Sequence, residues 1–417
     1  MLLPLRSTAL GLGLVLLASF SLPAQERGTP PTFTAGTELV LVDFVVSDDA
    51  DRLVKGLSAK DFVVKEDGKE RPIVSFVAFA GDEPPAPVAT AAPATSPAAD
   101  ASPAVPPAVA VRSAGAATVL LVDDAQLTQQ QVSQLRPALK TLLARVGERS
   151  GTVALVAPTS KVSVAERFPS GAATLTAAVD QIVGRRFEDH SSFPVSDSEA
   201  IAVAREDTQT LGRVASRFVQ LNPNLTRDQA TMLAHNRGTE VAFDARTRRQ
   251  ILYGVARLGL DWLSRQPGRH SLVIVSGGFA RDPEDSAFNE IVTRSLRVNA
   301  PIHFLDARGL QGIGLQSVQY GPGVSPAADY APLTWSEDAE GSSGLADDTG
   351  GISVRNSNDM GKGLGRVLDM MQTYYILGYE PPANAKSGFR KINVTVRAKG
   401  LHVRARRGYL AGPPPRR

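Results

Sequence analysis

The chain of 417 residues contains no cysteine, and only 6% of its residues are aromatic. The absence of cysteine excludes disulfides, thiolate metal sites and a cysteine nucleophile. A protein without these features must be stabilised by packing alone. For an exported protein, this is more typical of the bacterial envelope than of small disulfide-rich secreted domains.

An excess of charge of one sign is also missing. The chain has 45 basic and 42 acidic residues, for a net charge of +3. This excess is too small to indicate nucleic-acid binding, so we expect no nucleic-acid partner. The basic run from Arg397 to Arg407 alternates with apolar residues, which predicts the solvent-facing side of a strand.

Long apolar runs are absent except at the N-terminus. Arg6 precedes the apolar segment Leu10–Phe20, and Ser21–Ala24 follows it. The pattern predicts a signal peptide over residues 1–24, cleaved after Ala24. An uncleaved anchor is the alternative, although the run is short for a span of about 20 residues. We therefore expect an exported protein that is periplasmic, at the cell surface or secreted, with no stable membrane span after cleavage.

Two segments at opposite ends of the chain have β-like patterns. Residues 37–80 contain three predicted strands, with a hairpin signal at Asp67-Gly68. Residues 373–411 contain three more. Because either set is too small to form a stable sheet structure by itself, we expect them to pair as one β-sandwich.

Between these segments, residues 81–116 form an Ala/Pro-rich linker that we expect to be disordered. Residues 117–372 then alternate apolar strands, such as Thr118–Val122 and Ser271–Val275, with helices. Thr128 is the expected N-cap of the first helix, and further helices are predicted over 172–183 and 199–219. This pattern predicts an α/β fold, with a Rossmann-like doubly wound and mainly parallel sheet inserted in the sandwich.

Five stretches, spread over nearly the whole chain after the predicted signal peptide, carry a family resemblance. They are Val42–Glu66, Phe304–Leu310, Ala346–Gly351, Tyr374–Tyr379 and Arg406–Tyr409. Together they resemble the acidobacterial-type VWFA-related family, whose central domain is a von Willebrand factor A-like domain. The resemblance implies that fold and a binding function, but names no partner.

The resemblance also implies a divalent cation at the carboxyl ends of the strands, held by an Asp-x-Ser-x-Ser motif and a later aspartate. Asp123 matches the first aspartate, but Ala125 and Leu127 replace the serines. Ser276-Gly277-Gly278 replaces the usual Thr-Asp-Gly. The sequence therefore has only a degenerate form of the family's cation-binding motif, the metal-ion-dependent adhesion site (MIDAS). We therefore expect no metal or other cofactor. An alternative is that Asp123, Asp124 and Asp306 hold Mg²⁺ or Mn²⁺ in another arrangement. Otherwise the two adjacent aspartates would be solvated rim residues, one of which caps the following helix.

Catalytic motifs are not evident. The chain has no His-Glu-x-x-His and no Gly-x-Ser-x-Gly motif, and Glu188-Asp189-His190 is expected to be a polar loop. We expect a binding protein that contacts a protein ligand at the strand ends. The alternatives are a structural envelope component and a hydrolase of unrecognised type in the 184–240 insertion. The expected ligand-binding rim consists of Asp123, Asp124, Gln126, Ser276, Phe279 and Asp306.

Overall fold

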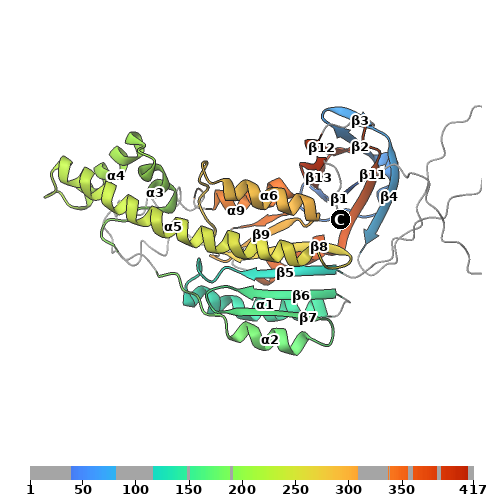
Figure 1. Ribbon diagram of the computed structural model, residues 1–417, viewed down its shortest axis with the longest axis horizontal. Coiled ribbons are helices and arrows are strands. Elements are labelled where there is room, and N and C mark those ends of the chain that lie inside the picture. The colour runs from blue at the N-terminus through green and yellow to red at the C-terminus, as the bar shows by residue number, and fades with distance from the viewer. Residues whose placement is uncertain are drawn as a thin grey trace, which may run out of the picture. The chain divides into compact units, whose positions relative to one another are not determined.

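The computed structural model describes residues 39–80, 116–147, 151–187, 191–308, 337, 339–355, 360–382 and 387–411 (Figure 1). The expected signal peptide, the linker up to residue 115 and the Glu188–His190 cluster lie outside these residues. Within the described ranges, no helix has the length and apolar character needed to cross a membrane.

Six strands form one sheet, here called the α/β sheet. Its order is β10-β9-β8-β5-β6-β7, and every neighbouring pair is parallel except β6 and β7. The fold is therefore α/β with a mixed, mostly parallel sheet, as predicted in outline; the antiparallel edge strand β7 was not expected. The strands are β5 (Ala116–Val122), β6 (Gly151–Ala157), β7 (Val162–Arg167), β8 (Arg269–Ser276), β9 (Ile302–Asp306) and β10 (Ser353–Val354).

The first strand of this sheet, β5, lies in its middle. The chain adds β6 and β7 on one side of β5, then returns and adds β8, β9 and β10 on the other side. This doubly wound order places the reversal of winding next to β5. Leu120 and Val122 of β5 belong to one buried cluster and Val119 and Leu121 to another, so the strand is buried on both faces.

Helices cover both faces of the α/β sheet. On one face, Leu139 of α1 and Val367 of α10 pack in the first cluster. On the other, Ala256 of α5 and Ile291 of α6 pack in the second. Each large side chain buried in this way contributes roughly 1.5–3 kcal/mol. The helices are α1 (Gln129–Gly147), α2 (Ala172–Asp180) and α10 (Met360–Gln372) with the first cluster, and α5 (Arg227–Leu263), α6 (Ser286–Val298) and α9 (Glu340–Thr349) with the second.

Two antiparallel sheets, here called the terminal sheets, combine strands from both ends of the chain. Their orders are β13-β1-β11-β4 and β14-β12-β2-β3. Each end supplies four strands rather than the expected three, because β3 and β14 are short strands that the sequence pattern did not reveal. The strands are β1 (Val40–Asp48), β2 (Phe62–Glu66), β3 (Lys69–Arg71), β4 (Ile73–Ala80), β11 (Thr373–Tyr379), β12 (Gly388–Val396), β13 (Leu401–Ala405) and β14 (Gly408–Ala411), with the short 3-10 helix η1 (Ala59–Asp61) before β2.

The terminal sheets share one aromatic core. The rings of Phe44 and Phe62 lie 4.9 Å apart in an edge-on arrangement, and Tyr375 lies 5.4 Å from Phe44. The Tyr375 hydroxyl donates a hydrogen bond to the Val54 carbonyl at 2.9 Å. A residue from the C-terminal part of the chain therefore fixes both the core and a loop of the N-terminal part.

The region between α2 and β8 differs most from the sequence prediction. The single helix expected over 199–219 is two helices, α3 (Asp197–Ala204) and α4 (Thr208–Leu221). Glu206 between them has φ 63°, which ends helical geometry, and the Asp207 side chain caps α4. The helix predicted over 172–183 ends at Asp180.

These helices form a small unit of their own, here called the helical extension: α3, α4 and residues 227–247 of α5. Val214 and Phe218 of α4 pack against Ala230 and Ala234 of α5 in a separate apolar cluster. The extension therefore has a core distinct from the two that cover the α/β sheet.

Candidate functional site at the strand ends

Three of the predicted rim residues come together where the parallel strands end. Ser276 is the last residue of β8 and pairs in register with Asp306, the last residue of β9. Asp123 follows β5, and its amide donates to the Val275 carbonyl at 2.8 Å. The site thus lies beside the reversal of winding, which is where open α/β sheets bind ligands.

Asp123 is wholly buried at the centre of this edge. Its Oδ2 accepts a hydrogen bond from the Ser276 hydroxyl at 2.7 Å. Its Oδ1 is buried and has no hydrogen-bond partner among the described residues. Burial is the main cause that raises the pKa of Asp123 from 3.8 to about 7; the Ser276 hydrogen bond opposes this rise, and the charge of Asp124 adds to it. Asp123 is therefore poised to hold a proton near neutral pH.

Asp124 has a structural role instead. Its two carboxylate oxygens accept hydrogen bonds from the amides of Thr159 and Ser160, at 3.0 and 2.6 Å. It holds the turn between β6 and β7. The expectation that the aspartates are solvated, and that one caps the next helix, was wrong: both are fully buried.

The cap of α1 is Thr128, as predicted. Its hydroxyl accepts from the Gln131 amide at 3.2 Å, and the Gln131 side chain accepts from the Thr128 amide at 2.9 Å. This reciprocal pair is a capping box, which satisfies two backbone donors at the helix start.

Gln126 connects the rim to the helical extension. Its Oε1 accepts a hydrogen bond from Nε of Arg248 on α5 at 2.9 Å. Nη2 of Arg248 donates to both carboxylate oxygens of Asp197 on α3, at 3.0 and 2.9 Å. One arginine therefore joins the edge of the sheet to two helices through hydrogen bonds from its Nε and Nη2 atoms.

Gly277 allows the backbone at this position to lie close to the backbone of Gln126. A Cβ at this position would lie 2.6 Å from the Gln126 carbonyl oxygen, which real side chains do not tolerate. The glycine at the position where the resemblance implies an aspartate therefore has a packing function here.

Phe279 and Asp306 are the last two residues of the predicted rim, and both contact other residues inside the protein. The Phe279 ring is buried and packs edge-on against Tyr253, with centroids 5.5 Å apart. The Phe279 amide donates to the Ser342 hydroxyl at 3.0 Å. Asp306 forms an ion pair with Arg308 at 2.7 Å.

The six rim side chains are between 0% and 4% exposed. They therefore do not themselves form the open contact surface that we expected from the sequence, because each is turned toward a partner inside the protein. Their participation in ligand binding stays a prediction.

The rim residues do not fit the cation site that the family resemblance implies. Ala125 and Leu127, at the serine positions, are buried apolar side chains. Asp124 is committed to two amides and Asp306 to an arginine. Over the described ranges, no group of three or more His, Asp or Glu side chains is arranged to hold a metal ion.

Sequence reasoning missed the arginines around the rim. Arg248 belongs to the run Arg246-Thr247-Arg248-Arg249. Arg249 is 2% exposed and lies 3.2 Å from Asp282 and 3.5 Å from Asp285. A run of arginines in a helix that packs on a sheet indicates buried ion pairs, so the run was a usable signal. Nothing in the sequence, however, identified the acidic partners.

No protein-family model matches this chain, and no curated protein matches it. Among solved structures it is similar to proximal thread matrix protein 1 from the mussel byssus, with 9% identity, a TM-score of 0.27 and coverage of 70% of this chain. The alignment covers 49% of the mussel protein, so the chain spans about half of its length. It is also similar to the N-terminal domain of TFIIH p34, with 12% identity, a TM-score of 0.26 and coverage of 61% and 96% of the two chains. At TM-scores this low, neither likeness carries an argument about fold or function.

Proposed function

We propose that this chain is an exported, non-catalytic binding protein. In this proposal a von Willebrand A-like domain is inserted in a β-sandwich formed by the two ends of the chain, and it binds another protein in the cell envelope or outside the cell. The observation that carries the proposal is the link between the expected ligand position and the helical extension. Arg248 makes this link by bonding Gln126 and Asp197.

The surface of the extension supports a protein partner. Met232 and Phe243 on α5 are 64% and 71% exposed. Their spacing along the helix is about three turns, so they lie on one face. Methionine and aromatic side chains are enriched at protein interfaces. The contact surface is therefore proposed on the extension, with the buried rim as its support.

Site-specific photocross-linking tests this placement. A photoreactive phenylalanine analogue would replace Phe243 in one protein and Phe389 of β12 in another; Phe389 is a matched control because it is a 55% exposed phenylalanine far from the extension in sequence. The two proteins would be incubated with envelope and culture-medium proteins. We expect a discrete adduct from position 243 and none from position 389.

A charge-introducing variant provides the second arm. Met232→Glu combined with Phe243→Glu should weaken capture of the cross-linked partner at least tenfold, while Phe389→Glu should not. An adduct from position 389 alone, or equal adducts from both positions, would contradict the proposed surface. No adduct from either position would favour the structural envelope component.

A further inference from the structure

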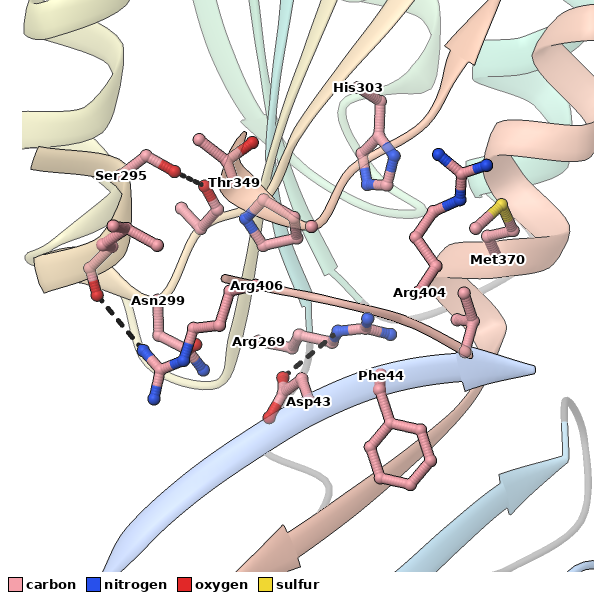
Figure 2. Close-up of a pocket in the computed structure, with 15 residues that line it drawn as sticks. Asp43, Phe44, Arg269, Ser295, Asn299, His303, Thr349, Met370, Arg404 and Arg406 are labelled. Atoms are coloured by element: carbon pink, nitrogen blue, oxygen red, sulfur yellow. Dashed lines mark hydrogen bonds and ion pairs between the residues drawn. The ribbon is translucent and has the colours of Figure 1, made fainter. Parts of the chain in front are cut away.

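A cavity lies at the opposite end of the α/β sheet from the rim, next to the terminal sheets (Figure 2). Its lining includes Asp43 of β1, Arg269 at the start of β8, His303 of β9, and Arg404 and Arg406 in and after β13. These residues come from four separate parts of the chain. The cavity is a narrow space that is partly open to solvent.

His303, which lines this cavity, carries a buried donor that has no partner among the described residues. The residue is 3% exposed, and its Nδ1 lies 3.3 Å from the amide of Ile352. Because this amide can only donate, Nδ1 must carry the lone pair, and in the neutral ring the hydrogen lies on Nε2. Nε2 is buried and has no hydrogen-bond partner in the described part of the chain. Burial lowers the pKa of His303 to about 3, and the charges of Arg269 and Arg404 add to this effect, so the ring is neutral at pH 7.

Three guanidinium groups line the same cavity. Arg269 uses Nη1 to donate to the Met371 carbonyl at 2.8 Å, and Arg406 donates from Nη2 and Nη1 to the carbonyls of Leu41 and Leu296, at 2.6 and 3.2 Å. The Nε atoms of both arginines are buried without a hydrogen-bond partner among the described residues. Each such unpaired donor is unfavourable, because its hydrogen bond to water is lost on burial and is not replaced.

Acidic groups offset these charges only in part. Within the described residues, Asp43 is the carboxylate in the cavity lining, and its Oδ2 lies 3.6 Å from Nε of Arg269, too far for a hydrogen bond (Figure 2). Asp347, which is half-exposed, lies 3.4 Å from Nη1 of Arg404 but does not line the cavity. Donors and positive charge are therefore in excess over acceptors at this place.

We propose that this cavity binds a small oxyanion, such as phosphate or sulfate, through Arg269, Arg404, Arg406 and the Nε2–H of His303. Guanidinium groups match the geometry of oxyanions and form two hydrogen bonds at once. An oxyanion would supply the acceptors that the unpaired donors lack and the negative charge that the arginines lack. The inference does not depend on the proposed protein-binding function.

Titration calorimetry of the mature protein with sodium phosphate tests the proposal, with sodium chloride adjusted to hold the ionic strength constant. We expect saturable binding of one phosphate. Arg404→Met should weaken it at least tenfold. Arg407→Met is the matched control, because it removes the same charge from a neighbouring residue that pairs with Asp348 instead of lining the cavity; it should change affinity by less than about twofold.

A second variant keeps the test decisive if Arg404→Met does not fold. His303→Asn retains an acceptor for the Ile352 amide but removes the Nε2 donor, and it should weaken phosphate binding about fivefold. The proposal is overturned if wild-type protein shows no saturable binding. It is also overturned if Arg404→Met and Arg407→Met weaken binding equally, since that would indicate a diffuse effect of surface charge, or if His303→Asn binds phosphate as tightly as wild type.

Discussion

The two ends of the α/β sheet differ in the charged groups that they contain and in how far the hydrogen-bonding capacity of these groups is satisfied. At the carboxyl ends of the strands, acidic groups are gathered and nearly all of their acceptors are matched: Asp124 by backbone amides and Asp306 by an arginine. At the amino ends, arginines and a neutral histidine are gathered, and several of their donors have no partner among the described residues.

This difference bears on how a binding site is located. The fold and the family resemblance both direct attention to the carboxyl ends. There, however, the charged groups are used to hold the helical extension and a turn in place. Neither the fold nor the resemblance predicts a ligand at the amino ends, yet these ends hold unsatisfied donors that a ligand could satisfy. The larger number of unsatisfied donors, rather than position in the fold, is therefore the basis on which we propose a ligand at the amino ends.

The largest expected effect at the rim concerns Asp123. Its folded-state pKa is raised from 3.8 to about 7, so the folded protein holds this proton more tightly than the unfolded chain. Its stabilising contribution is fully present below about pH 4 and is lost as the pH rises to about 7. Asparagine does not ionise, so the Asp123→Asn variant does not lose stability in this way. Its free energy of unfolding relative to that of wild type should therefore rise by at most about 4 kcal/mol between pH 4 and pH 8.

Urea unfolding of both proteins across this pH range measures the effect. A constant difference between Asp123→Asn and wild type would show that the pKa of Asp123 is not raised in the folded protein, so that its carboxylate is ionised over most of this pH range. The rim would then hold an uncompensated charge, and the comparison between the two ends would lose its basis.

Arg248→Met should have the next largest effect. The variant leaves the Asp197 carboxylate and Gln126 Oε1 without their shared donor, at a cost of about 2–3 kcal/mol because the arginine is mostly buried. Arg246→Met, on the same helix but exposed, is the control and should change the free energy of unfolding by less than about 0.5 kcal/mol. Equal effects of the two substitutions would mean that Arg248 does not join the extension to the rim.

Ser276→Ala should destabilise the protein by about 1 kcal/mol, because it removes the hydrogen bond to Asp123. That hydrogen bond opposes the rise in the Asp123 pKa, so its loss should raise the pKa further. The free energies of unfolding of wild type and Asp123→Asn diverge with rising pH until Asp123 is ionised. When both proteins also carry Ser276→Ala, this divergence should continue to a higher pH. A shift of this pH downward would contradict the assigned role of Ser276.

The smallest effect is expected at the amino ends. Arg404 is half-exposed, so Arg404→Met should change the free energy of unfolding by less than about 1 kcal/mol in chloride. In phosphate the difference should grow, because only wild type is stabilised by ligand binding. Chemical denaturation in the two salts measures this difference; a variant that gains as much stability from phosphate as wild type would argue against the cavity.

Local features of the fold could be predicted from sequence because they depend on neighbouring residues. The apolar runs at 118–122 and 271–275 are strands β5 and β8, and Thr128 caps α1. The break at Glu206 was missed because a helical pattern continues on both sides of one residue with positive φ. The edge strand β7 was missed because its half-buried pattern in a short segment is a weak signal.

The sites could be predicted only in part, since they depend on contacts across long stretches of sequence. Asp123, Ser276 and Asp306 were placed at one edge because parallel strands end together. Their burial was not foreseen, because it depends on contacts between residues far apart in the sequence, such as the hydrogen bond from Ser276 to Asp123. In the run Arg397–Arg407, which was expected to face solvent, Arg397 and Arg407 are exposed as expected. Arg404 and Arg406, however, line the cavity with Arg269, a grouping that no periodicity reveals.

Thermal unfolding of the wild-type protein in two parallel titrations tests the contrast between the ends most directly. One titration would use sodium phosphate and the other magnesium chloride, both at an ionic strength held constant with sodium chloride. We predict that phosphate raises the melting temperature in a saturable way, because the amino-end cavity binds it, and that Mg²⁺ has no comparable effect. A saturable rise with Mg²⁺ and none with phosphate would contradict the account, because it would place the open site at the rim.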